Sequence, residues 1–268
     1  MAASRRAFLQ GVAVLGASGT LLRPAGASID AADPAPAPSE FPRQDADSVR
    51  DTVGASHRDL DKVKGLVGER PALAKAAWDW GFGDWETALG AASHVGRRDI
   101  AEYLIEQGAR IDIFAAAMLG QTEVVRAFIE ASPGIQRTPG PHGIPLLAHA
   151  RAGGTQAAAV VALLEKVGDA GIVQRSADLT EEQFRMCLGT YVFGTGAGER
   201  FVIKDVKGAL QLVTGEGAGR ALFHLGNLEF HPTGARAVRI AFEAGAGGAT
   251  RVTVRDGGVV VVAARADL

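Results

Sequence analysis

The sequence predicts a multidomain α+β protein: a short α-solenoid of stacked helical pairs, followed by an antiparallel all-β domain that is either a sandwich or a small barrel. Two observations predict this division. Apolar residues recur at one-face helical spacing through residues 46–172, whereas from residue 182 onward short β-branched runs alternate with turn residues. The composition, 47% hydrophobic and 22% charged, is typical of a globular protein with a core.

The chain begins with a pattern typical of an export signal. Residues 4–10 read Ser-Arg-Arg-Ala-Phe-Leu-Gln, an apolar stretch covers 11–22, and small residues follow at 25–27. This order resembles a bacterial twin-arginine (Tat) signal peptide. We therefore expect residues 1–27 to be removed and the protein to be periplasmic or secreted. The alternative is an uncleaved leader that tethers the protein, although roughly twelve apolar residues are too few for a span of about twenty.

Residues 28–45 are rich in Ala and Pro, so we expect a disordered spacer there. The net charge is −2 and no basic run stands out, which argues against a nucleic-acid partner. Cys187 is the only cysteine, which excludes an intrachain disulfide. It lies in an apolar run, so we expect a buried side chain rather than a reactive thiol.

The helical half contains similar segments at irregular intervals. Four of them align, at 61–67, 99–105, 123–129 and 158–164. Their equivalent apolar positions, at Leu66, Leu104, Phe128 and Leu163, are separated by 38, 24 and 35 residues. Such spacing predicts one helical pair repeated with connections of variable length.

The second copy has the features of a known repeat. Thr87, Leu89 and Ala92 match part of a Thr-Pro-Leu-His-x-Ala pattern, and Gly96 and Gly108 stand at the turn and after the second helix. This copy resembles an ankyrin repeat, a resemblance that extends over about residues 55–170. The resemblance implies an ankyrin-like repeat domain at 46–172 that binds another protein through its loops and first helices.

The second half, 182–268, is predicted to contain eight short strands separated by glycine-rich turns. We expect them at 188–194, 199–205, 209–214, 220–224, 226–230, 236–243, 249–255 and 258–264. Its sequences Leu-Gly-Thr-Tyr at 188–191 and Lys-Gly-Ala-Leu-Gln-Leu at 207–212 are similar to the small all-β domain that follows β-lactamase-like serine hydrolase modules. The resemblance implies an accessory domain without catalytic residues.

A search for reactive groups predicts no enzyme. No Gly-x-Ser-x-Gly or Ser-x-x-Lys motif occurs in a strand–helix context, and Ser93-His94 ends a predicted first helix. No two of the six histidines are four residues apart, as zinc ligands on one helix often are. His224 and His231 flank a predicted hairpin, but two ligands do not make a site. We therefore expect no catalytic, cofactor-binding or metal-binding residue.

The candidate partner-binding residues are aromatic side chains of a long connection, together with one histidine in a second turn. They are Trp78, Trp80, Phe82, Trp85 and His142. Trp and Phe rings bury much area at an interface for little loss of entropy. The alternative for Trp78 and Trp80 is packing beneath their own loop. The alternative for His142, within 139–143, is an ordinary tight turn.

These observations predict an exported, non-enzymatic binding or scaffold protein with a protein partner of unknown identity. The alternative is a periplasmic carrier or sensor that holds a small apolar ligand inside the β domain, since eight strands leave just enough room. A cryptic hydrolase is a third interpretation, which lacks a nucleophile constellation.

Overall fold

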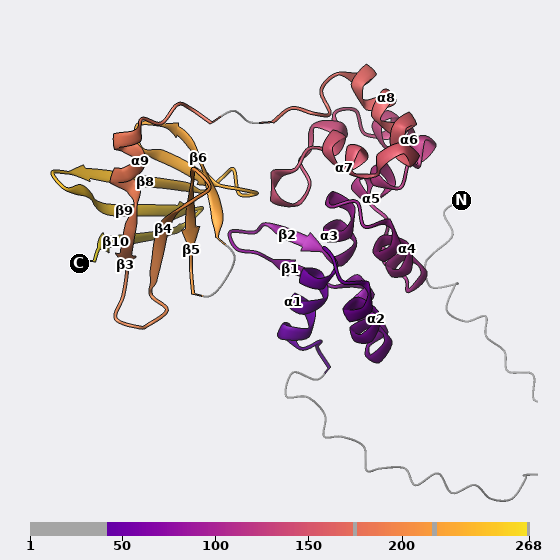
Figure 1. Cartoon of the computed structure of the whole chain (residues 1–268), viewed down its shortest axis with the longest axis horizontal. Coiled ribbons are helices and arrows are strands. Elements are labelled where there is room, and N and C mark those ends of the chain that lie inside the picture. The colour runs from indigo at the N-terminus through magenta and orange to yellow at the C-terminus, as the bar shows by residue number, and fades with distance from the viewer. Residues whose placement is uncertain (1–41, 174–175, 216–218, 267–268) are drawn as a thin grey trace, which may run out of the picture. The chain divides into compact units, whose positions relative to one another are not determined.

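The computed structural model describes residues 42–173, 176–215 and 219–266, with elements from α1 to β10 (Figure 1). The predicted signal peptide at 1–27 and residues 28–41 of the predicted spacer lie outside the described residues. Over the described ranges, none of the helices has both the length and the apolar content to cross a membrane.

In the first described region, eight helices form four successive contacting pairs. They are α1 Ala46–Ala55, α2 Leu60–Glu69, α3 Ala88–His94, α4 Arg98–Glu106, α5 Ile113–Met118, α6 Thr122–Ala131, α7 Leu146–Ala152 and α8 Ala158–Val167. Side-chain caps start several of them: Asp45, Asp59, Thr87 and Asp112 each accept a hydrogen bond from a backbone N–H of the first turn. The helix α1 packs on α3, and α3 packs on α5.

The predicted ankyrin-type solenoid is wrong. Instead of one continuous apolar seam, the helices bury two separate cores, one built around Leu73, Ile100 and Leu104 and the other around Val125, Leu146 and Leu164. Short 3₁₀ segments lie between successive pairs, at Pro71–Lys75, Ile135–Arg137 and Pro141–Gly143, and one lies within the last pair, at Gly154–Ala157. Apolar periodicity shows which face of a helix is buried, but it does not show whether successive pairs share one geometry. The unequal spacing of the aligned segments is consistent with pairs that differ.

The eight predicted strands of the second region are confirmed. They are β3 Gly189–Val192, β4 Arg200–Val206, β5 Ala209–Val213, β6 Arg220–Gly226, β7 Glu229–Pro232, β8 Arg239–Gly245, β9 Gly248–Asp256 and β10 Val259–Arg265. They form a closed antiparallel barrel in which β10 pairs with β3 (Figure 1). The sandwich alternative is therefore wrong. Turn residues predict which neighbours pair, but they do not reveal whether the first and last strands meet.

The barrel interior is filled by alternating side chains of its strands. Tyr191, Phe230 and Phe242 lie at its centre, with ring centroids 5.5 to 5.7 Å apart for the contacting pairs. The helix α9, Glu181–Cys187, precedes β3 and starts at a capping box formed by Thr180 and Gln183. Cys187 is buried, as the sequence predicts.

The long connection after α2 forms a two-stranded hairpin, β1 Ala77–Asp79 paired with β2 Trp85–Thr87. Its tip, 80–84, includes Phe82 in the left-handed region, at φ 60°. Phe82 packs against the barrel core, and Asp84 forms an ion pair with Arg220 at the start of β6. The hairpin therefore contacts both helical residues and barrel residues.

Candidate metal centre

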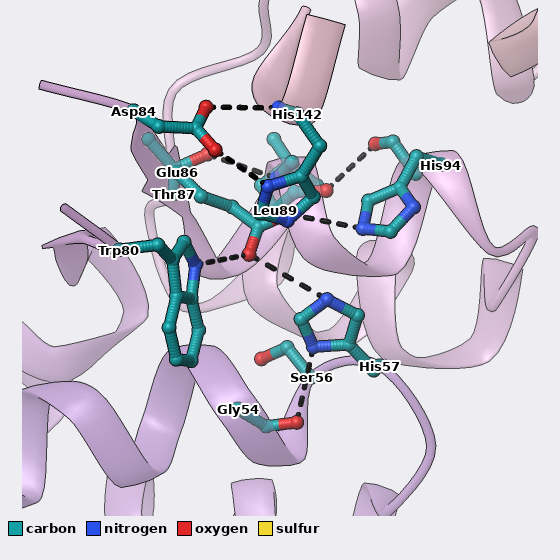
Figure 2. A network of polar contacts seen from close by, with 12 residues as sticks. Gly54, Ser56, His57, Trp80, Asp84, Glu86, Thr87, Leu89, His94 and His142 are labelled. Carbon is teal, nitrogen blue, oxygen red and sulfur yellow. Dashed lines mark hydrogen bonds and ion pairs between the residues drawn. The ribbon is translucent and has the colours of Figure 1, made fainter. Parts of the chain in front are cut away.

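Four side chains from separate elements converge beside this hairpin (Figure 2). Glu86 lies on β2, directly before Thr87, whose side chain caps α3. His94 is the last residue of α3, His57 follows α1, and His142 lies in the turn before α7. The packing of α1 on α3 brings two of the histidines to the same place.

The ligand atoms of the four side chains all lie within 4.8 Å of one another. Glu86 Oε1 is 3.0 Å from His94 Nε2 and 3.3 Å from His142 Nε2. Glu86 Oε2 is 3.5 Å from His57 Nε2. Four ligands at about 2.0–2.1 Å from a tetrahedral ion would be about 3.3 Å apart, and the two separations from Glu86 Oε1 are close to this value.

The opposite edges of two rings are held by hydrogen-bond acceptors. His57 Nδ1 lies 3.1 Å from the carbonyl oxygen of Gly54, and His142 Nδ1 lies 2.7 Å from Asp84 Oδ2. Because a carbonyl and an ionised carboxylate only accept, Nδ1 carries the hydrogen in both rings. When such a ring is neutral, with its proton on Nδ1, the lone pair of Nε2 is directed at the centre. This is the outer-shell arrangement of metal-bound histidines.

Three histidines approach the carboxylate of Glu86 within 3.5 Å, and one tryptophan donates a hydrogen bond to it. Trp80 Nε1 donates a hydrogen bond of 2.7 Å to Oε2 (Figure 2). Oε1 and His94 Nε2 are buried, and neither has a hydrogen-bond partner among the described residues. They are close, but not aligned for a hydrogen bond. A buried polar atom without a partner costs about 1–3 kcal/mol, so this geometry calls for a partner between the two atoms.

The backbone of His142 is in the left-handed region, at φ 59°. This conformation is uncommon for a residue with a side chain, and it persists where contacts hold it. Asp84 supplies those contacts: one carboxylate oxygen accepts from the His142 backbone N–H at 2.9 Å, and the other accepts from the ring. Asp84 therefore fixes the direction of the His142 ring.

The neighbouring charges in the cluster shift the pKa values of Glu86 and His142. Burial raises the pKa of Glu86, but the approach of His142 and His94 outweighs burial and lowers it to about 2. Burial lowers the pKa of His142, but its contacts with Asp84 and Glu86 outweigh burial and raise it to about 9. Without an ion, His142 is therefore a cation between two carboxylates at neutral pH.

A pocket of about 380 Å³ opens beside the cluster. On one side it is lined by His57, Trp80 and His142, and on the other by barrel residues that include Gln211, Arg220 and Thr233. The side chains of His57 and His142 are 26% and 22% exposed, whereas Glu86 is fully buried. The cluster is thus accessible from the pocket.

The other three histidines do not join the cluster. His149 is buried against Phe114, and burial lowers its pKa to about 4. His224 pairs with Phe230 across the strands, and His231 pairs with Phe223. Because successive residues of a strand point to opposite faces, His224 and His231 lie on opposite faces and form no site together.

The structure separates the aromatic residues proposed for partner binding. Trp78 and Trp80 pack against the helical core, and Phe82 packs against the barrel core. Trp85 is 63% exposed. His142 belongs to the polar cluster. Binding of a protein partner by these five residues stays a prediction, with Trp85 as the exposed member.

Sequence reasoning missed the convergence of His57, His94, His142 and Glu86. A signal for two of them was present. His57 and His94 are 37 residues apart (94 − 57), close to the 38 between Leu66 and Leu104 in the aligned helical pairs. Equivalent positions in neighbouring packed pairs lie side by side. No such regularity connects His142 or Glu86 to them, since both come from irregular connections.

Comparisons with known proteins do not assign the site. No model of a protein family matches the chain, and the search of curated proteins gives no match. The function must therefore be argued from the geometry of the site itself.

Proposed function

We propose that this protein binds one divalent transition-metal ion of the zinc class through His57, Glu86, His94 and His142. The observation that carries the proposal is the convergence of three imidazoles and one carboxylate, whose ligand atoms all lie within 4.8 Å of one another. Imidazole nitrogens with a carboxylate suit Zn²⁺ and its neighbours in the transition series better than Mg²⁺ or Ca²⁺, which prefer oxygen ligands alone.

An ion-paired network without metal is the competing account. It explains His142, which lies between Asp84 and Glu86. It leaves His94 Nε2 and Glu86 Oε1 buried 3.0 Å apart without a hydrogen bond among the described residues. A bound ion would satisfy all four groups at once.

Metal titration of the full chain tests the proposal. After treatment with a chelator, Zn²⁺ should bind with a stoichiometry of one by calorimetry, and Co²⁺ should give visible absorption bands characteristic of histidine ligation. Zn²⁺ at a hundred times its Kd should stabilise the fold by about 2.7 kcal/mol and raise the Tm.

The variant His57→Ala removes a ligand whose side chain is partly exposed, so it should fold normally. We expect its Zn²⁺ affinity to fall by about a hundredfold or more, since even outer-shell changes cost 10–100-fold. The matched control is His231→Gln, a buried histidine of the barrel. Equal affinity in the wild type and His57→Ala, or absence of stoichiometric binding, would contradict the proposal.

A further inference from the structure

The pocket beside the cluster has a distinctive charge. Asp84 and Glu86 supply two negative charges, and Arg220 supplies one positive charge through its ion pair with Asp84. A divalent ion held by neutral imidazoles would add two positive charges. The loaded site would then carry one positive charge in excess, in a region where both carboxylates are buried. Such a site attracts a monoanion.

Arg220 has donor capacity that its present contacts do not use. Its Nη2 donates to Asp84 and, at 3.1 Å, to the carbonyl oxygen of Thr233. Its Nη1 approaches His142 Nδ1 at 3.4 Å, but Nδ1 already donates to Asp84 and cannot accept. Its Nε–H is buried without a partner among the described residues. Arg220 lines the pocket, and its Nη1 is the donor left for a bound anion.

The rest of the lining favours an organic acid. Trp80 and Ala221 present apolar surface, whereas Gln211 and Thr233 present polar atoms. A volume of about 380 Å³ is in the range of small-molecule sites. The Nη1 group of Arg220 can donate a charge-assisted hydrogen bond to one oxygen of a carboxylate.

From this arrangement, and resting on the metal centre proposed above, we propose that the pocket binds a small carboxylate, which becomes a fifth ligand of the metal ion and accepts a hydrogen bond from Arg220. The histidines that face the pocket leave the ion accessible from this side. The metal centre is then a ligand-binding site rather than a closed structural one.

Titration of the Co²⁺-loaded full chain tests this proposal separately from the metal centre. The Co²⁺ spectrum without additive reports the metal site alone. Acetate should then change the visible bands saturably, whereas acetamide, which has the same shape without the charge, should not. If acetate leaves the bands unchanged, or if acetamide has the same effect, the carboxylate proposal is overturned while metal binding stands.

The role of Arg220 is tested by Arg220→Gln, with Arg239→Gln on β8 as the matched control. We expect Arg220→Gln to weaken the apparent acetate affinity by about tenfold or more, since it removes a charge-assisted hydrogen bond, and Arg239→Gln to leave it unchanged. Equal acetate affinities in both variants would overturn the role of Arg220. If Arg220→Gln no longer gives the Co²⁺ spectrum, Arg220→Lys replaces it, because lysine keeps a positive charge beside Asp84. The comparison of acetate with acetamide in the wild type decides the carboxylate proposal in either case.

Discussion

The helical region and the barrel bury different kinds of side chain. At the centre of the barrel lie aromatic rings such as Tyr191 and Phe230, both fully buried. Beside α3, the helical region buries the carboxylates of Asp84 and Glu86, which are 3% and 1% exposed. Burial of an apolar side chain stabilises a fold directly, whereas burial of a charge is costly unless partners offset the cost.

This contrast indicates which region is specialised for binding. The interior of the barrel is explained by packing, since its alternating strands fill it. Packing does not explain the His57–Glu86–His94–His142 cluster, in which three imidazoles approach one buried carboxylate. Departures from local rules concentrate at functional sites.

The largest expected effect tests the barrel side of this comparison. Phe230→Ala should lower the free energy of unfolding by about 3–5 kcal/mol, because it removes a fully buried ring and leaves a cavity among Tyr191, Phe242 and their neighbours. Urea denaturation followed by far-UV circular dichroism measures the loss. A change below about 1 kcal/mol would show that the barrel interior is not packed as described.

A glycine of the barrel tests whether the two regions are coupled through Asp84. Gly234 has φ +79°, and a Cβ there would lie 2.3 Å from Asp84 Cγ. Gly234→Ala should therefore displace the carboxylate that orients His142. We expect a loss of about 2–3 kcal/mol in stability and a 10–100-fold loss of Zn²⁺ affinity.

The matched control for this variant is Gly257→Ala, at φ +54° with no atom within 4 Å of its Cβ. This variant also places a side chain at positive φ, which costs about 1 kcal/mol, but its Cβ meets no neighbouring atom. Zn²⁺ titration and thermal unfolding of both variants separate the two contributions. Equal Zn²⁺ affinities would show that Asp84 does not position the metal ligand His142.

The smallest expected effect concerns a single hydrogen bond in the helical region. Trp80→Phe keeps an aromatic ring against the helical core but removes the donor to Glu86 Oε2. We expect a loss of about 1.5 kcal/mol in the free energy of unfolding, because a hydrogen bond to a charged group is lost. Trp85→Phe, at a side chain 63% exposed, should change stability by less than about 0.5 kcal/mol. Urea denaturation of both variants measures the loss in the free energy of unfolding. An equal loss in both variants would contradict the assigned role of Trp80.

More of the barrel than of the helical region could be predicted from the sequence, and the reason is physical. The strands from β3 to β10 were predicted because alternation and turn residues are local signals, legible within about ten residues. The helices were predicted by their apolar spacing, but their assembly into a regular solenoid was wrong because assembly depends on contacts between distant segments. The candidate site was missed because its residues come from four elements, and no short motif connects 57, 86, 94 and 142.

By itself the sequence determined the eight strands of the barrel, the helical character of the first region, the burial of Cys187 and the absence of an intrachain disulfide, since each depends on local pattern or composition. The β1–β2 hairpin and the helix α9 were not predicted. Only the tertiary structure decided that β10 pairs with β3, that Asp84 reaches Arg220, and that three imidazoles meet one carboxylate. These outcomes depend on distances between residues far apart in the chain, and such distances are fixed by packing.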